Sequence, residues 1–344
     1  MTRHTPARLT AASIALAACA ALHPAAAASA SPDKVDRAAH RPLVWVRYTP
    51  ATDSAALVAG RLDGSQQRQL TNPEPGLRDA DPVRSPDGTR VIFHREFPDG
   101  TVRIGIVPVR GGPTRFVETG CQDPCFSDQG PAWTPDGNRL TFVRVMGPFD
   151  PVTGDAASAL QYTERLDGTD LRLLSVPGNY EDNTVRFSPD GRYMVFTRDQ
   201  TVDGVLHFAI FRMRSDSTHV RQLTPWDLDA DRPAVSPARS GPTAGLVSFE
   251  TNGGGHPTQG DVALLPASCP TIEACTDATR LVTHNTGTTK TSFAASWSPT
   301  GDRLAFVQGD GTGNDDVFTI RPDGGDQRQV THLPVPEYSP AWSY

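Results

Sequence analysis

Short segments in which apolar and polar residues alternate recur along the chain from about residue 42 to the C-terminus. RLAFVQ from Arg303 and DVFTI from Asp316 are two examples. A period of two residues is typical of β-strands with one buried face. Asp-Gly and Gly-Gly turns separate many of these segments, as in β-hairpins. Because no segment is convincingly helical, we predict an all-β protein.

Two short signatures group these strands into repeats. The first is Ser-Pro-Asp-Gly or a degenerate form of it, at residues 85–88, 134–137, 188–191, 236–239 and 298–301. The second is an arginine that begins a short strand ending mostly in threonine, at Arg68, Arg115, Arg172, Arg221, Arg280 and Arg328. These arginines follow one another at intervals of 47, 57, 49, 59 and 48 residues. Such a period is typical of the four-stranded blades of a β-propeller.

The first repeat lacks its innermost strand, and the C-terminus carries one strand more than the last repeat needs. PLVWVRY, from Pro42 to Tyr48, begins directly at the second strand of a blade. The C-terminal Pro-Ala-Trp-Ser at 340–343 matches Pro-Ala-Trp-Thr at 131–134, which belongs to an innermost strand. Pairing the last strand with the first blade would leave no open edge. We therefore predict a six-bladed β-propeller with four-stranded blades, closed by the C-terminal strand pairing into the N-terminal blade.

These signatures resemble those of the TolB-like, WD-repeat-like β-propeller family, whose repeats carry W-S-P-D-G and D-G-G-x-x-R-Q-L-T. The resemblance covers residues 42–344 and implies the propeller fold. It implies little about function, because one fold serves many functions. We expect no counterpart of the α/β domain that precedes the propeller in TolB, so the role of TolB in envelope assembly is not carried over.

The first 30 residues have the organisation of an export signal, with a basic start, a short apolar run and small residues. The apolar run, at about 9–22, is too short to cross a bilayer. Ala-x-Ala sites at 26–28 or 28–30 favour cleavage and secretion, whereas Leu-Ala-Ala-Cys at 16–19 resembles a bacterial lipobox that would lipidate Cys19. Both routes place the folded part outside the cytoplasm. We expect a signal at 1–30, a linker at 31–41 and the propeller at 42–344.

The charge balance disfavours two classes of partner. The chain has 32 basic and 39 acidic residues, and removing Arg3 and Arg8 with the leader leaves 30 against 39, a net charge of −9. Duplex nucleic acid and anionic membranes attract basic surfaces instead. We expect a monomer with no transmembrane span.

The four cysteines beyond the leader form two close pairs, Cys121 with Cys125 and Cys269 with Cys275. In an oxidising compartment close pairs favour local disulfides. The alternative is a four-cysteine zinc site, but the two pairs lie far apart in the repeat. We predict two disulfides, one in a connection from strand d to the next strand a and one in a c-to-d hairpin.

Acidic residues gather in the connections from each outermost strand d to the next innermost strand a. They are Glu74, Asp79, Asp123, Asp128, Glu181, Asp182, Asp227, Asp229, Asp231 and Glu337. This pattern predicts an acidic ring at the channel mouth that attracts a cation or a basic peptide. Asp79, Asp128, Asp182 and Glu337 share one register, so for these we favour a structural carboxylate that bonds the loop backbone in every blade.

The remaining candidates for a ligand-binding face are Tyr180, Trp226, Asp227, Asp229, Asp231 and His256. The three aspartates at alternate positions resemble the start of a calcium loop, but the glycine and distant glutamate of an EF-hand are missing. We therefore expect no cofactor, with calcium at these aspartates as the alternative. Trp133, Trp297 and Trp342 share one place on the innermost strand, which favours blade packing.

No catalytic motif is present in the sequence. It contains neither a G-x-S-x-G elbow nor H-E-x-x-H, and a lone histidine such as His94 or His207 is interpreted as packed or solvated. We predict an exported, noncatalytic binding module for an envelope or extracellular protein, peptide or glycan. The alternative is a channel-centred, calcium-dependent hydrolase, lyase or lactonase, which convergence of a histidine and carboxylates from several blades would favour.

Overall fold

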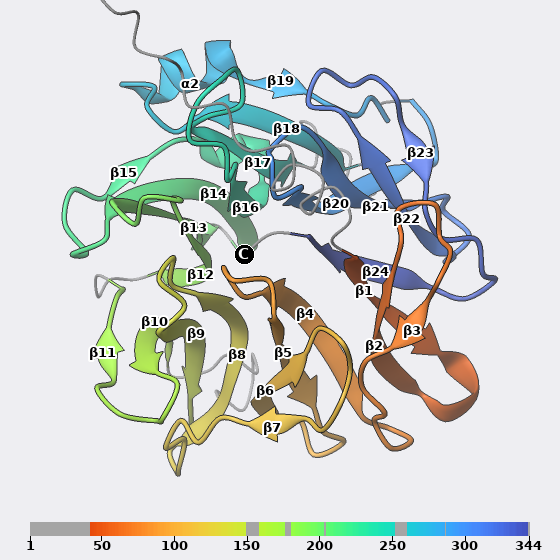
Figure 1. Cartoon of the computed structure of the whole chain (residues 1–344). Coiled ribbons are helices and arrows are strands. Elements are labelled where there is room, and N and C mark those ends of the chain that lie inside the picture. Colours follow the sequence, from red (N-terminus) through yellow and green to blue (C-terminus); the bar gives the residue numbers. More distant parts are fainter. Residues whose placement is uncertain are drawn as a thin grey trace, which may run out of the picture.

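The computed structural model describes residues 42–148, 158–175, 180–202, 204–251, 260–285 and 287–342. The predicted leader and linker, Cys19 and His256 lie outside this part. The described chain is built of antiparallel β-sheets arranged around a common centre (Figure 1). No helix in the described part is long and apolar enough to cross a membrane.

The sheets follow one another along the chain. An eight-stranded sheet contains β24 (Glu337–Ala341), β1 (Leu43–Thr49), β2 (Ser54–Gly60), β3 (Arg68–Gln69), β4 (Arg78–Arg84), β5 (Arg90–Glu96), β6 (Val102–Pro108) and β7 (Arg115–Phe116). The next sheet contains β8 (Cys125–Trp133), β9 (Arg139–Met146), β10 (Ser158–Arg165) and β11 (Arg172–Leu173). The third contains β12 (Glu181–Phe187), β13 (Tyr193–Val202), β14 (Val205–Arg214) and β15 (Arg221–Gln222).

The last two sheets have the same order of strands. One contains β16 (Ala230–Val235), β17 (Leu246–Thr251), β18 (Asp261–Pro266) and β19 (Arg280–Leu281). The other contains β20 (Thr291–Trp297), β21 (Leu304–Gly309), β22 (Asp315–Ile320) and β23 (Arg328–Gln329). Within the eight-stranded sheet, β2 and β4 share a single parallel bridge, Ala55 with Arg78. Two antiparallel four-stranded units therefore meet at this bridge.

Strand β24 pairs with β1, as the repeat count predicted. Val44 lies opposite Ala341 and Arg47 opposite Glu337. Trp342, only 3% exposed, packs in one cluster with Leu43 and Trp45. The two ends of the described chain therefore share one sheet.

The six arginines of the second signature each begin a two-residue outer strand, from β3 to β23. The threonine or serine that follows explains the signature, because its hydroxyl oxygen accepts a backbone N–H from the neighbouring strand. The donor and acceptor pairs, at 2.8–2.9 Å, are Leu57 with Thr71, Gln161 with Ser175, Ile210 with Thr224, Val262 with Thr283 and Val317 with Thr331. A side chain thus replaces a partner that the short outer strand cannot supply.

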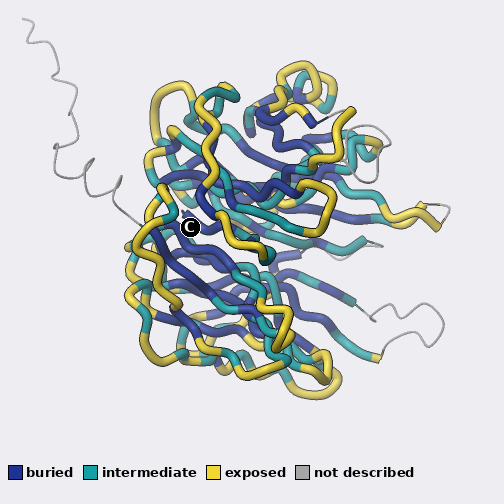
Figure 2. The backbone as a smooth tube through the Cα atoms, turned by 90° about the vertical axis from the view of Figure 1, so that its right-hand side faces the viewer, coloured by how far each residue is buried: buried dark blue, intermediate teal, exposed yellow. Residues whose placement is uncertain are grey.

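One fully buried aromatic side chain stands at the same place on the second strand of each unit. These residues are Trp45, Phe93, Phe142, Phe196, Phe249 and Phe306. The predicted packing role of the inner-strand tryptophans is confirmed for Trp133 and Trp297. Their indole N–H groups donate to the carbonyl oxygens of Val83 and Ala234 in the preceding inner strand, at 3.1 and 3.0 Å. Figure 2 shows buried segments through the body of the molecule and exposed segments at its edges.

The all-β prediction is confirmed, but the described part also contains short helices that the sequence did not indicate. Helix α2 (Ile272–Ala278) lies between β18 and β19, and two short 3-10 helices, η1 (Pro50–Thr52) and η2 (Trp226–Leu228), occur in other loops. The Thr271 side chain caps α2 by accepting the N–H of Ala274, and the disulfide from Cys269 to Cys275 ties the helix to the loop before it. Two turns of helix are too short for an apolar period to show in the sequence.

Candidate functional site

A cavity of about 350 Å³ lies at the centre of the sheets, among the innermost strands. Its lining comes from β4, β8, β12, β16, β20 and β24, with contributions from the adjoining strands β5, β9, β13 and β14. Figure 1 shows these inner strands nearest the centre of the arrangement. We call this cavity the central channel.

Each inner strand contains one residue in the left-handed backbone region. These residues are Asp81, Gly130, Thr184, Arg232, Ala294 and Ser339, with φ between 46° and 58°. The pairing with the neighbouring strand shifts register beside each of them. A bulge of this kind bends a strand and redirects its side chains, and all six residues line the central channel.

One wall of the channel holds a histidine between two carboxylates. His94 Nδ1 lies 3.7 Å from Asp81 Oδ2, and His94 Nε2 lies 3.5 Å from Glu96 Oε1. The backbone N–H of Gly130 points at the same Nδ1 atom, at 3.3 Å. His94 is buried, whereas both carboxylates reach the channel. This wall is therefore acidic whenever His94 is neutral.

On a second wall Arg232 lies beside Glu250 of β17, which is not itself among the lining residues. Arg232 Nε lies 3.5 Å from Glu250 Oε1, and the N–H of Ala294 donates to Glu250 Oε2 at 2.8 Å. Burial raises the pKa of Glu250 to about 7, although the positive charge of Arg232 opposes the shift. The neighbouring Asp231 accepts hydrogen bonds from the hydroxyl of Thr197 and the N–H of Arg232. Glu250 and Asp231 thus already have hydrogen-bond or ion-pair partners within the protein.

Arg186 on β12 has no carboxylate partner within ion-pair distance in the described part of the chain. The contact recorded for its guanidinium is the carbonyl oxygen of Val185, to which Nη1 donates at 2.9 Å. Burial lowers the pKa of Arg186 to about 10, against the pull of Asp81. Burial also acts to raise the pKa of Asp81, but the interactions with His94, Arg232 and Arg186, together with a hydrogen bond from Ser339, outweigh it and keep that pKa below its usual value. Both groups are therefore charged at neutral pH.

The four acids that share one register have a structural role, but the expected partner was wrong. They lie within inner strands and pair with an arginine of the second strand rather than with loop backbone, because that arginine stands directly opposite in the register. The pairs are Asp79 with Arg95, Asp128 with Arg144, Asp182 with Arg198 and Glu337 with Arg47. These four members of the predicted acidic ring are therefore neutralised.

A signal for these arginines was present in the sequence and was missed. An aromatic residue stands two positions before each of them, in Trp45-x-Arg47, Phe93-x-Arg95, Phe142-x-Arg144 and Phe196-x-Arg198. In the last three cases the guanidinium carbon lies 5.4–5.8 Å from the centre of that ring. Such stacking helps an arginine to be buried.

Tyr180 and Trp226 serve packing in the third sheet and do not line the channel. The Arg198 guanidinium carbon lies 3.5 Å from the centre of the Tyr180 ring. The rings of Trp226 and Phe211 lie 5.7 Å apart. Tyr180 thus contacts Arg198 of the ion pair directly, and Trp226 contacts Phe211, over which Arg198 also lies.

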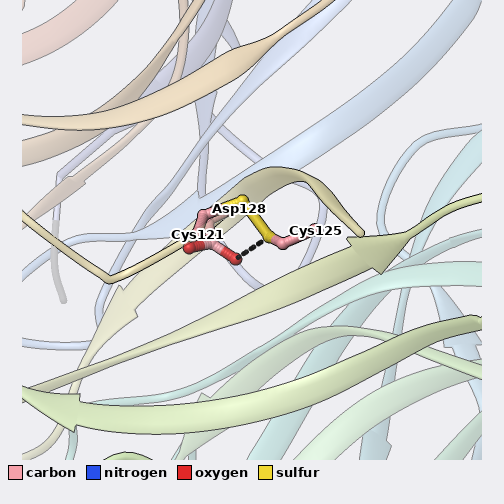
Figure 3. Close-up of side chains that lie close together, drawn as sticks. All are labelled: Cys121, Cys125 and Asp128. Carbon is pink, nitrogen blue, oxygen red and sulfur yellow. Dashed lines mark hydrogen bonds between the residues drawn. A yellow bond between two sulfur atoms is a disulfide. The ribbon is translucent and has the colours of Figure 1, made fainter. Parts of the chain in front are cut away.

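The three aspartates proposed for calcium take separate surroundings. Asp227 is exposed on η2, Asp229 lies 3.2 Å from His207 Nδ1, and Asp231 faces the channel. Among the described residues, one set with metal-ligand spacing occurs: Cys121, Cys125 and Asp128 (Figure 3). Its two sulfur atoms form a disulfide, so neither is free as a thiolate ligand.

Both predicted disulfides are confirmed in their predicted connections. Cys121–Cys125 lies at the entry to β8, and Cys269–Cys275 lies between β18 and β19.

The residues that the sequence left unassigned are Asp81, Glu96, Arg186, Arg232 and Glu250. His94 was interpreted only as a packed or solvated histidine, whereas it also faces the channel. The register offered a signal, because Asp81 stands two positions after Asp79 and Ser339 two positions after Glu337. This recurrence marks where the inner-strand bulges lie, but it does not say which charged side chains meet at the channel.

No protein-family model and no curated protein sequence matches the chain. Solved structures do. TolB from Acinetobacter baumannii has a TM-score of 0.67 at 17% identity, covering 88% of this chain and 66% of TolB. A chain of a nidogen/laminin complex has a TM-score of 0.61 at 14% identity, with coverages of 87% and 97%. An oligogalacturonate lyase in complex with manganese has a TM-score of 0.50 at 16% identity, with coverages of 85% and 73%.

These likenesses show a TolB-like β-propeller fold. The chain spans about two thirds of the length of the TolB chain that it matches. At these identities the comparison concerns the fold, and the chemistry must come from the residues of the channel.

Proposed function

We propose that this TolB-like β-propeller is an extracytoplasmic binding module that holds its ligand in the central channel. The observation that carries the proposal is that Asp81 and Arg186 face one cavity from different sheets, with no ion pair between them in the described residues. Asp81 has His94 at 3.7 Å and a side chain that is 37% exposed, whereas Arg186 has no ion-pair partner among the described residues, and a charge without a partner is costly. A ligand that supplies the missing partner would recover that cost, and a cavity with a few convergent polar groups is the usual form of a binding site.

We infer that the ring has six blades and that residues 42–344 form one propeller. Dividing the eight-stranded sheet at its single parallel bridge leaves two four-stranded units beside four separate sheets. The recurrence of a left-handed residue in β4, β8, β12, β16, β20 and β24 supports the same number.

We infer a location outside the cytoplasm. The two disulfides support it, because such bonds persist in oxidising compartments. The leader at 1–30 remains the predicted export signal, with secretion or lipidation at Cys19 as the two routes.

The ligand class that we propose is a peptide, a protein segment or a glycan. A chain of a nidogen/laminin complex has this fold, so a propeller of this size occurs in a protein assembly. Calcium at Asp227, Asp229 and Asp231 stays a proposal that a comparison with and without calcium would test.

A second candidate function is a channel-centred hydrolase, lyase or lactonase. The observation in its favour is His94 between Asp81 and Glu96, since a histidine oriented by carboxylates is a frequent general base. The cavity also collects these groups in one place, as catalysis requires. Turnover of a captured ligand that is lost in His94→Gln would establish this function.

Capture from the native envelope tests the binding function. The folded domain, immobilised, would be incubated with extract with and without calcium, and retained molecules identified by mass spectrometry. The channel variant Asp81→Asn/Arg186→Met serves as the comparison, and Asp63→Asn/Arg192→Met, at exposed positions, is the matched control. We expect ligands that the wild type and the control retain and the channel variant loses. Identical retention by all three proteins would refute binding in the channel.

A further inference from the structure

We infer that the central channel recognises a small zwitterion, with its ammonium group at Asp81 and Glu96 and its carboxylate at Arg186. This is the chemistry of a free amino acid or of a short peptide with both termini unblocked. The inference rests on the proposed binding function and names the ligand class of the same site.

The carboxylate subsite follows from the surroundings of Arg186. Arg186 lines the cavity, and within the described residues no acid lies in ion-pair contact with its guanidinium. Arg232, the other arginine of the lining, already has Glu250 at 3.5 Å. A guanidinium binds a carboxylate through two parallel hydrogen bonds, which makes arginine the preferred partner of that group. Arg186 therefore retains donors for a ligand.

The ammonium subsite follows from the part of the lining that β4 and β5 supply. Asp81 and Glu96 flank His94 at 3.7 and 3.5 Å, distances longer than a strong hydrogen bond. The Gly130 N–H occupies the His94 Nδ1 atom, so a neutral ring with Nδ1 as acceptor fits this geometry. Two carboxylates on one wall would then hold a positive charge better than either does alone.

The two subsites select against molecules with a single charge. Asp81 and Arg186 both line the channel and influence each other electrostatically, yet in the described structure they form no ion pair. A simple anion at Arg186 would meet the field of Asp81 and Glu96, and a simple cation would meet Arg186 and Arg232. A ligand with both charges satisfies both walls at once, because each of its ends adds an attraction.

The size of the cavity limits the ligand. A volume of about 350 Å³ lies at the small end of ligand sites, which usually hold about 300–1,000 Å³. Amino acids and peptides of two or three small residues fit this volume, and their backbone supplies further polar groups for Asn183 and Ser339 at the wall.

Calorimetric titration with trialanine and its blocked forms tests the inference. The probes are free trialanine, N-acetyl-trialanine, trialanine amide and the doubly blocked peptide, with free alanine as the short form. We expect free trialanine or alanine to bind, and each block to weaken binding at least tenfold. Which of the two binds more tightly distinguishes a peptide from an amino-acid ligand.

Two single variants test which channel residue binds each end of the peptide. Arg186→Met should bind the free peptide and the amide equally, and Asp81→Asn should bind the free and the N-acetylated peptide equally. Asparagine tolerates the left-handed backbone at position 81, where φ is 46°, so this variant keeps the bulge. Asp63→Asn and Arg192→Met should behave as the wild type, and thermal melts confirm that every variant is folded.

The outcomes separate the two levels of the proposal. Equal binding of free and blocked peptides, or no binding of any of these probes, overturns the zwitterion while leaving the capture experiment to decide whether the channel binds something else. If both channel variants still bind the free peptide more tightly than the blocked peptides, the zwitterion inference is also overturned, because other residues must then recognise the two ends of the peptide.

Discussion

Glu164 is a single side chain that departs from the repeat. It stands on β10 where the other units carry Gly60, Val107, Met213, Leu265 and Ile320, all buried. Glu164 is itself only 1% exposed, and its Oε2 atom lacks a hydrogen-bond partner among the described residues. Burial raises its pKa to about 7, although Arg144 opposes the shift. An unsatisfied buried carboxyl of this kind lowers stability.

Replacing Glu164 should change how stability depends on pH. The folded pKa of about 7 exceeds the unfolded value of 4.5, so the folded state binds the extra proton between these values and stability falls as pH rises through the window. Above pH 7 the penalty reaches about 2–3 kcal/mol. We expect Glu164→Met to raise the free energy of unfolding at pH 8 by about 2 kcal/mol and to flatten the profile, measured by urea denaturation from pH 4.5 to 8. Glu118→Gln, at an exposed position, is the control, and an unchanged profile in Glu164→Met would contradict the argument.

The outer strands depend on a side chain as much as on backbone pairing. Strand β23 has two residues, and Thr331 after it is fully buried. The Thr331 hydroxyl accepts the N–H of Val317 and donates to Asp316 Oδ1, both at 2.9 Å. The same contact appears with Thr71, Ser175, Thr224 and Thr283 in other units. The feature that these five units share at this position is therefore a side-chain hydroxyl group.

Thr331→Val should weaken this outer strand. The change keeps the shape of the side chain but leaves the Val317 N–H and the Asp316 carboxylate without their partner, which costs about 1–3 kcal/mol. Thr331→Ser keeps the hydroxyl, as Ser175 does in its own unit, and should cost about 1 kcal/mol or less. Chemical denaturation of both variants makes the comparison. Equal losses in the two variants would mean that the methyl group matters and the hydroxyl does not.

The pairing of β24 with β1 joins the two ends of the described chain and so affects the whole molecule. Strand β24 places Glu337 against Arg47 and the indole N–H of Trp45, each at 2.8 Å or less. It also brings Trp342 into the cluster with Leu43 and Trp45. The last strand therefore completes the core of the first unit, and it contributes Ser339 and Pro340 to the channel.

Deleting residues 334–344 should lower the stability of the entire domain. Moving the same residues to the N-terminal side of β1 should restore that stability. The loss exposes the core around Trp45 and removes Trp342, a change worth at least about 3 kcal/mol. Because β24 runs antiparallel to β1, with Ala341 opposite Val44, the same residues can be placed ahead of Pro42 through a short turn. We expect the deletion to lower the melting temperature and the transplant to recover most of it. A deletion with the wild-type melting temperature would show that β24 adds nothing to the fold.

Much of the architecture was readable in the chain because its signals are local and repeated. Proline, aspartate and glycine at 85–88 make a turn wherever they occur, and the arginine and threonine from Arg328 to Thr331 mark an outer strand for reasons confined to one hairpin. The pairing of β24 with β1 needed only a count of strands. Helix α2 was not predicted, because a threonine cap and a disulfide stabilise it and its sequence shows no apolar period.

The channel was decided by tertiary structure. The predicted ligand contacts Tyr180 and Trp226 pack against Arg198 and Phe211 outside the channel lining, whereas His94 and Arg186, which the sequence did not single out for binding, line the cavity. A strand pattern with a period of two predicts which face of the sheet each side chain points to. A bulge at Asp81 or Thr184 changes that direction locally. Which charges remain unpaired depends on residues of separate sheets meeting at the centre, and no spacing along the chain encodes that meeting.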